Sequence, residues 1–379
     1  MTFSLDRRQA RRATIAGLAC GILALSACQT RAPVRPLPGE VQPPLAGARH
    51  EVALIVPLSG EDGGVGTSIS NAARLALLDT GNQTIDLNIY DSAQGGAAAA
   101  AFKAVADGNR LILGPLLAEE VRAAAPIARQ ARVPVIAFSN DESVAGDGVF
   151  ILGFTPRQSI GRVVQYARAR GAQRIGALVP AGVYGERAAE ALRSSLQASG
   201  GTLGAVETFS RSTAGVRTAA NALNAKGRHD SILIADSSRI AAQAALSLKA
   251  GSRLLGTELW GNDRTIDTNA RLRGSWFAAA PDARFDQLVT RYRARYGKIP
   301  YRLGSLGYDA VLLTVRAARN WPAGRPFPQR VLTEREGFAG VDGIFRFDRD
   351  GIAERALEVR EVTAAGAKVV SPAATTFGN

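Results

Sequence analysis

Short, fully apolar runs alternate along this chain with longer Ala-rich stretches that have a helical period. In residues 185–199, Ala188, Leu192 and Leu196 recur at every fourth position, so one stripe of a helix faces a sheet. The runs 53–56 and 232–234 are apolar at every position, which predicts strands buried on both faces. This order predicts an α/β fold with doubly wound parallel sheets.

The same pattern sets the expected elements. Strands are expected at residues 52–56, 85–90, 110–113, 133–137, 149–152, 174–179, 203–209, 231–234, 253–255 and 275–278. Helices are expected at 69–78, 97–106, 118–130, 158–170, 185–199, 216–224, 239–249, 284–296 and 303–320. The two strand–helix series are similar in size, which suggests two lobes. Near the end, 343–347 and 356–362, joined by a polar turn at 348–351, predict a closing β-hairpin.

Residues 1–27 have the pattern of a secretory signal peptide. Four arginines within residues 7–12 precede an uncharged, mostly apolar run at 13–27. This run is shorter than the ~20 residues that span a bilayer, so a permanent transmembrane anchor is the weaker interpretation.

The end of that run, Leu-Ser-Ala-Cys at 25–28, resembles the lipobox of bacterial lipoproteins. The resemblance implies that Cys28 is acylated and becomes the first residue. Gln29 follows it, which implies outer-membrane sorting on the periplasmic side of the envelope. The alternative is an ordinary signal peptide with an incidental Cys28. Residues 28–49 are Pro-rich and read as a linker, which at ~3.1 Å per residue spans roughly 65 Å.

Charge and composition narrow the chemistry. The formal net charge is +13, but only five of the 46 basic residues are Lys and no polybasic run occurs after the signal peptide. Export makes nucleic acid a poor partner, whereas phospholipid headgroups or peptidoglycan carboxylates are possible anionic partners. With two Cys, Cys20 and Cys28, and two His, His50 and His229, most metal sites and His-based triads are excluded. We expect no cofactor and no metal, and we place both histidines at the surface.

Ligands of open α/β sheets bind beyond the carboxyl ends of strands. The Gly-rich loop at 57–66 contains Glu61 and Asp62 and lacks a following Lys-Ser/Thr pair, which favours a flexible cleft loop over a nucleotide site. No Gly-x-Ser-x-Gly motif is present. Hydroxyls and carboxylates at strand ends suit an ammonium group or acid–base chemistry. The candidate ligand-binding residues are Ser59, Ser139, Asp141, Tyr184, Asp236, Ser237 and Glu258. Helix N-capping is the alternative role for Asp141, Asp236 and Ser237.

Several motifs in shared order carry a family resemblance. They are 52–60, the Gly-Pro turn at 114–115 with 125–126, 133–136, 184–185, 308–310 and 343–347. Over residues 50 to about 372 the chain resembles type I periplasmic binding proteins of the leucine/isoleucine/valine-binding kind. Segments 255–257, Trp260, 274–277 and 340–343 look closer still to penicillin-binding protein activator lipoproteins.

The resemblance implies two Rossmann-like lobes joined by three crossovers, with a ligand cleft between them that closes by hinge motion. The lobes would comprise 50–152 with 280–338, and 153–279 with 339–379. The family's carboxylate-binding hydroxyl falls on Ala118, a departure that puts a free branched-chain amino acid in doubt. The remaining ligand contacts fall on Ser139, Asp141, Ser237 and Glu258.

Three functions stay open at this point. We expect a non-enzymatic, lipid-anchored protein that binds a small polar, amino-acid-like or peptidoglycan-derived ligand and acts as a penicillin-binding protein activator on a peptidoglycan synthase. The alternative is the substrate-binding component of an amino-acid ABC transport system, with a permease as partner. The third is an envelope hydrolase that uses Asp141 or Glu258.

Overall fold

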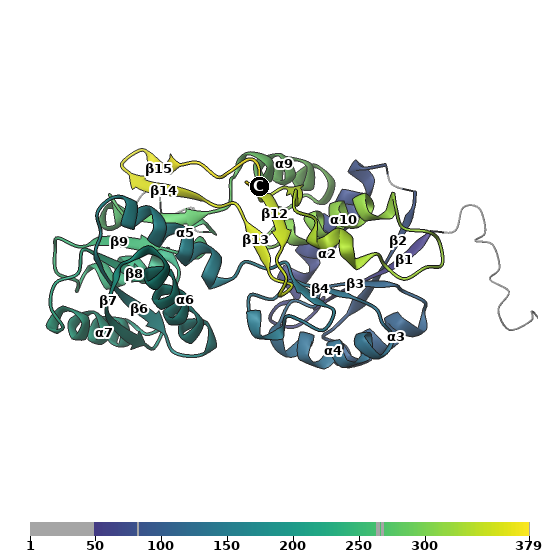
Figure 1. Ribbon diagram of the computed structural model, residues 1–379, viewed down its shortest axis with the longest axis horizontal. Helices are drawn as coiled ribbons and strands as arrows, with labels where there is room; N and C mark the ends of the chain where they lie inside the picture. The colour runs from purple at the N-terminus through teal and green to yellow at the C-terminus, as the bar shows by residue number, and fades with distance from the viewer. Residues whose placement is uncertain (1–48, 82, 263–265, 267–268, 379) are drawn as a thin grey trace, which may run out of the picture. The chain divides into compact units, whose positions relative to one another are not determined.

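The computed structural model describes residues 49–81, 83–262, 266 and 269–378. The predicted signal peptide, the lipidation site Cys28 and the linker up to residue 48 lie outside these residues. The described part contains three sheets, of which two are large, and Figure 1 shows both with helices packed against them.

Sheet A has the strand order β2-β1-β3-β4-β5, and all its strands are parallel. Its strands are β1 (His50–Val56), β2 (Ile85–Asp91), β3 (Leu111–Leu113), β4 (Val135–Ala137) and β5 (Val149–Ile151). Helices α3 (Gly96–Ala106) and α4 (Ala118–Gln130) cover one face, where their alanines pack on Ala53 and Ile55. Helices α2 (Gly63–Asp79) and α10 (Gly304–Ala318) cover the other face, against Leu54. The sheet is therefore doubly wound, as predicted.

Sheet B has the order β15-β14-β10-β9-β8-β6-β7. Its parallel strands are β6 (Arg174–Pro180), β7 (Thr202–Phe209), β8 (Ser231–Ile234), β9 (Arg253–Gly256) and β10 (Trp276–Ala279). Two antiparallel strands, β14 (Glu358–Thr363) and β15 (Gly366–Ser371), complete it. Helices α5 (Pro156–Ala169) and α6 (Val183–Ser199) pack on one face, and α7 (Thr213–Ala225) and α8 (Ser238–Ala245) on the other. Helix α9 (Ala283–Tyr296) follows β10.

The predicted closing hairpin is wrong in one strand. Residues 343–347 do form β12 (Gly343–Phe347), and Asp348 shapes the turn by accepting the Ile352 backbone N–H at 2.9 Å. The partner of β12 is β13 (Ala353–Arg355), whereas the predicted strand 356–362 becomes β14 and pairs with β10. Residues 356–357, which connect β13 to β14, are apolar like the strand that follows them. The sequence therefore contains no polar turn to mark where the chain moves from one sheet to the other.

The chain passes between the two large sheets at three places: from β5 to α5, from β10 to α9, and from β13 to β14. Strands β11 (Phe338–Gly340), β12 and β13 form a small antiparallel sheet. A bridge from Ile151 to Ile352 joins β5 of sheet A to this small sheet. Ile352 nevertheless falls within residues 339–379, which were predicted to belong to the second lobe. The exact lobe boundaries remain a prediction.

Both histidines are buried, which corrects the expectation that they lie at the surface. His50 is 8% exposed and stacks on Trp321 with ring centroids 4.0 Å apart. His229 is 5% exposed, and its Nε2 accepts the Ala205 backbone N–H at 3.1 Å. A Cβ on Gly204 would stand 2.3 Å from the imidazole, so a glycine in the adjacent strand makes room for the ring. Burial lowers the pKa of both imidazoles.

The two large sheets share one tight feature at the end of their first strand. A Cβ on Gly66 of α2 would stand 1.7 Å from the Pro57 carbonyl oxygen, and a Cβ on Gly185 of α6 would stand 1.7 Å from the Pro180 carbonyl oxygen. In both places the helix approaches the strand end so closely that only glycine fits. These contacts fix where each first helix starts above the carboxyl edge of its sheet.

We expect Gly185→Ala to destabilise the fold by at least about 2 kcal/mol, because the methyl group would overlap a backbone oxygen that cannot move freely. The matched control is Gly161→Ala in α5, where the nearest atom would be 3.6 Å from the new Cβ. That change should be neutral or stabilise the fold by up to about 1 kcal/mol. Chemical denaturation of both variants measures the difference, and equal midpoints would contradict the close-approach explanation.

Candidate functional site

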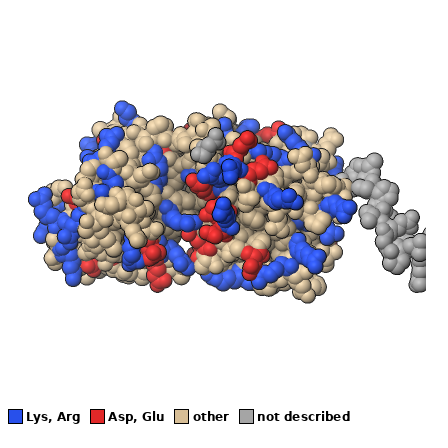
Figure 2. Space-filling model, viewed as in Figure 1, with Lys and Arg blue, Asp and Glu red and all other residues tan. Residues whose placement is uncertain are grey.

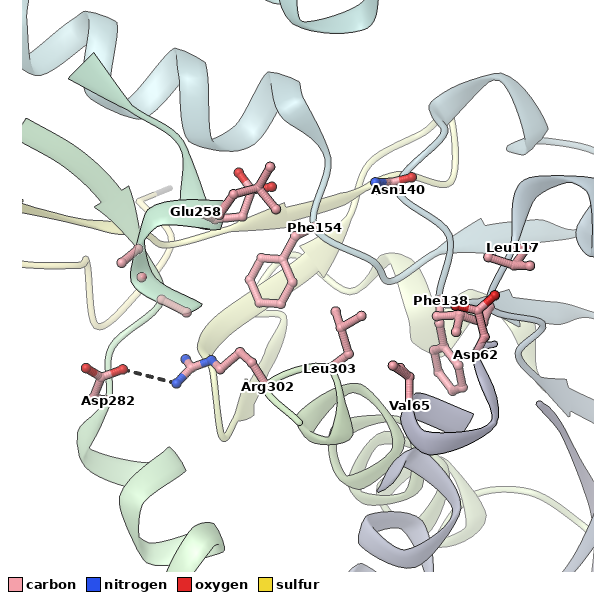
Figure 3. Close-up of a pocket in the computed structure, with 15 residues that line it drawn as sticks. Asp62, Val65, Leu117, Phe138, Asn140, Phe154, Glu258, Asp282, Arg302 and Leu303 are labelled. Atoms are coloured by element: carbon pink, nitrogen blue, oxygen red, sulfur yellow. Dashed lines mark hydrogen bonds and ion pairs between the residues drawn. The ribbon is translucent and has the colours of Figure 1, made fainter. Parts of the chain in front are cut away.

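A cavity of about 250 Å³ lies between the carboxyl ends of the two sheets, beside the crossovers from β5 and β10. Figure 3 shows Phe154, from the crossover into α5, standing between Glu258 on one side and Leu303 on the other. The walls of the cavity come from elements of both large sheets, so a molecule bound in it would contact both. The lining residues are Asp62, Val65, Leu116, Leu117, Phe138, Asn140, Phe154, Glu258, Leu259, Gly261, Ala279, Ala280, Asp282, Arg302 and Leu303.

Most of this wall is apolar. The leucines at 116 and 117 follow the Gly-Pro turn after β3, Phe138 follows β4, and Leu303 precedes α10. The Ala118 position, where the family places a carboxylate-binding hydroxyl, is the first residue of α4 and offers only a methyl group. The cavity therefore suits a ligand with an apolar body and few polar atoms.

Glu258 is one of three acids in this wall, with Asp62 and Asp282. It begins the 3₁₀-helix η2 (Glu258–Asn262) directly beyond β9, and its Oε2 is enclosed without a hydrogen-bond partner among the described residues. Burial raises the pKa of this carboxyl to about 7, an effect that the Ser159 and Tyr184 hydroxyls partly oppose. Near neutral pH the group can therefore either donate or accept a hydrogen bond.

Arg302, the basic residue of the wall, is held by the protein itself. Its guanidinium donates to Asp282 at 3.0 Å, marked by the dashed line in Figure 3, and to the fully buried Asp342 at 2.7 Å. It also lies 4.0 Å from the ring centroid of Phe285. Asp282 is paired in turn with Arg360 of β14. One ionic chain thus connects sheet B, the start of α9 and the residues just before α10.

A second buried acid lies next to this chain. Asp309 is 1% exposed, and its carboxylate accepts the Val341 backbone N–H at 2.6 Å. Burial, and then the neighbouring charge of Asp342, raise the pKa of Asp309 to about 7. Arg355, also buried, has its Cζ 4.5 Å from the Phe154 ring centroid, so the buried charges reach the back of the cavity wall.

Of the seven residues predicted as ligand contacts, Glu258 alone is among the residues that line this cavity. Ser139 and Asp141 flank the lining residue Asn140, but the Ser139 Oγ accepts the Asp141 backbone N–H at 3.1 Å. Asp141 pairs with Arg122 at 2.7 Å and with Arg187 of α6 at 3.7 Å, so it links elements of the two large sheets. Its carboxylate also caps the 3₁₀-helix η1 (Glu142–Val144).

The other four are engaged within the chain as well. The Tyr184 hydroxyl lies 3.4 Å from the Thr257 hydroxyl, and burial raises the pKa of Tyr184 well above its usual value. Asp236 pairs with Arg211 at 2.7 Å, and Ser237 caps α8. Ser59 is exposed, and its side chain contributes to lowering the pKa of Asp91. Capping, the alternative role for Asp141 and Ser237, is confirmed.

Sequence reasoning missed the apolar part of the site. The residues it did not single out include Phe154, which lies at the crossover into α5, Arg302, which lies just before α10, and the two leucines Leu117 and Leu259. The sequence did contain one signal of an apolar wall, which is the pair of leucines directly after the Gly-Pro turn. These leucines lie beyond the end of β3, so the burial of that strand does not explain them. In the part of the chain that the structure describes, no group of His, Cys, Asp and Glu is arranged to hold a metal ion. Within the same residues, no helix combines the length and apolar character that a membrane span requires.

Two parallel α/β sheets, three crossovers and a cavity between their carboxyl edges define a type I periplasmic binding protein fold. Residues 50–367 match the sequence profile of the family described as periplasmic binding protein, and the chain belongs to that family. This confirms the resemblance drawn from the motifs.

Individual relatives are distant. An uncharacterized protein of Rickettsia prowazekii is 27% identical over 147 residues, which are 38% of this chain and 39% of that one, so the chain matches about two fifths of its curated relative. A putative branched-chain amino acid ABC transporter protein from Rhodospirillum rubrum has a TM-score of 0.73 at 21% identity, covering 85% of this chain and all of that one. Full-length LpoA from Haemophilus influenzae has a TM-score of 0.66 at 19% identity, covering 88% of this chain and 60% of that one.

The raised pKa of Glu258 predicts a specific pH dependence. Because the folded state binds this proton more tightly than the unfolded state, whose pKa is near 4.5, stability should fall as the pH rises from about 4.5 to 7. Glu258→Gln removes this loss, so the variant should be more stable than the parent at pH 8 by about 2 kcal/mol and differ little at pH 4.5. Urea unfolding at both pH values tests this. A constant difference between the two proteins would show that the pKa is not raised.

We expect Arg302→Met to destabilise the fold by about 3 kcal/mol, because it leaves the fully buried Asp342 without its cation. The double variant Arg302→Met/Asp342→Asn should recover part of that loss, since no buried charge is then left unpaired. Denaturation midpoints of the parent, the two single variants and the double variant measure the coupling. Strictly additive losses would mean that the pair is not coupled.

Proposed function

We propose that this chain is a non-catalytic binding protein of the cell envelope that takes a small ligand into the cavity between its two large sheets. The observation that carries the proposal is the cavity itself, because it is walled by both sheets at the crossovers of the chain. In a two-lobed protein, a molecule bound there makes contacts that stabilise one relative position of the lobes.

The lining indicates the ligand chemistry. Leucine and phenylalanine side chains favour an apolar or aromatic body, and Glu258 favours an ammonium, amide or hydroxyl donor at one end. An amino-acid-like molecule with an apolar side chain fits this description. A strongly anionic ligand does not, because Arg302 already carries two carboxylates and Glu258 and Asp62 face the same space.

The amino-terminal sequence supports an address on the periplasmic side of the envelope, with Cys28 as a lipid anchor and the Pro-rich segment as a tether. A ligand receptor placed there would deliver its ligand to a membrane permease or report its presence to another envelope protein. Asp282, one of the acids of the cavity wall, is held by two arginines, and this supports a structural role for that acid.

A second candidate function is activation of a peptidoglycan synthase, as in penicillin-binding protein activators. It is favoured by the hydrogen bonds that occupy the other strand-end residues. Asp141 is bound by Arg122 and Arg187, and Asp236 by Arg211, so these side chains have partners within the chain. A protein whose strand-end side chains bind one another instead of a ligand can still present its outer surface to a partner protein.

Thermal unfolding of the full chain against isoleucine, isoleucinamide and a muropeptide separates the two candidates. A ligand at 100 times its dissociation constant stabilises the folded state by about 2.7 kcal/mol. We expect Leu259→Trp, which places an indole in the cavity, to abolish the stabilisation given by the compound that binds. The matched control, Leu246→Trp, changes a side chain that is 65% exposed and should leave the shift intact.

If none of the three compounds shifts the unfolding of the parent, the receptor proposal fails for these ligand classes. Stimulation of glycan-strand polymerisation by a purified peptidoglycan synthase then tests the second candidate. A shift that Leu259→Trp leaves unchanged would place the ligand elsewhere on the protein.

A further inference from the structure

An open depression of about 620 Å³ lies at the edge of sheet B opposite the cavity. It is formed where β8, β9 and β10 begin, whereas the cavity lies beyond the ends of β9 and β10. Four basic residues line it: Lys249, Arg253, Arg271 and Arg273, all of them exposed. In Figure 2 basic side chains gather along the left edge of the molecule, where sheet B lies in Figure 1.

A fifth cation reaches the same place. The Arg228 Nη2 lies 3.8 Å from the position that a Cβ on the lining residue Gly251 would take. The lining carboxylate is that of Asp230, whose Oδ2 accepts the backbone N–H groups of Gln173 and Arg174, each at 2.8 Å. The depression therefore has a strong excess of positive charge.

Several arginines elsewhere in the described chain are held in ion pairs, unlike the basic residues that line the depression. Arg122, Arg211 and Arg302, for example, each pair with a buried aspartate. Within the described ranges, by contrast, no carboxylate forms an ion pair with Lys249, Arg271 or Arg273. Arg253 stacks 4.0 Å from the Trp276 ring centroid and donates to the Gly274 carbonyl, which orients its guanidinium without neutralising it.

We propose that this depression binds the carboxylate groups of the cell-wall polymer, peptidoglycan. Guanidinium groups bind carboxylates through paired hydrogen bonds, and several weak contacts along one polymer chain add up to useful affinity. The proposal rests on the envelope location in the proposed function but not on the ligand cavity.

Two observations favour a polymer over a lipid surface. The large apolar residues that line the depression, Leu248 and Leu254, are partly buried rather than presented outward, so these two side chains are not placed to enter a bilayer. The described chain also begins at sheet A, whose first strand starts at His50, while the depression belongs to sheet B. A protein tethered through its amino-terminal end can therefore present this edge away from the membrane that anchors it.

Co-sedimentation of the full chain with purified peptidoglycan sacculi tests the proposal. The double variant Arg271→Glu/Arg273→Glu should bind at least about tenfold more weakly, because two attractive charges become repulsive. The matched control is Arg293→Glu/Arg295→Glu in the last turn of α9, which has the same charge change and spacing at exposed positions. It should bind within about twofold of the parent. Binding of the parent should weaken as NaCl rises from about 50 to 300 mM.

Unchanged thermal unfolding shows that the variant is folded; if it is not, Arg228→Glu/Lys249→Glu replaces it at the same depression. Absence of binding to sacculi at low salt, or an equal loss in the α9 control, overturns the proposal. Capture by vesicles of phosphatidylglycerol and phosphatidylethanolamine, lost in the same variant while sacculi do not bind, would assign the depression to lipid headgroups instead. A ligand-induced shift in thermal unfolding that survives in the variant would keep the cavity function separate.

Discussion

An ionic chain that contains the fully buried Asp342 is the constraint on which the arrangement of the two large sheets depends. Arg302 connects Asp342 to Asp282, which Arg360 of sheet B also holds. A charge taken out of water must keep its partner, so Asp342 and Arg302 are held together. Four segments supply these residues: the turn between β11 and β12, the residues just before α9, those just before α10, and β14. The ion pairs therefore join these segments into one connected unit.

This unit also shapes the cavity. Arg302 contributes its stem to the wall while its charge is directed to aspartates, which leaves leucines and phenylalanines to face the interior. Glu258 and Asp62 supply the remaining acidity, and burial brings the pKa of Glu258 to about 7, so that this carboxyl can hold or release a proton near neutral pH. The site thus combines a mostly apolar volume with few polar groups, whereas the strand ends suggested a cluster of hydroxyls and carboxylates.

Part of the site was predictable, and the reason lies in the geometry of parallel sheets. Glu258 follows β9 directly, and side chains at the carboxyl end of a central strand must face the cleft. The same rule placed Asp141 and Asp236 near the cleft but could not show that Arg122 and Arg211 already bind them. Those arginines come from other elements, so their approach depends on packing that no local pattern contains.

The sequence by itself determined the α/β class, the order of strands and helices and the family, because the hydrophobic period and the turn residues act over short distances. Tertiary structure alone decided that β12 pairs with β13 and that β14 joins sheet B, since an apolar run is equally satisfied in either sheet. It also decided the burial of His229, which needs the space left by Gly204 in another strand. Local chemistry specifies which elements form, and contacts between distant segments specify what those elements enclose.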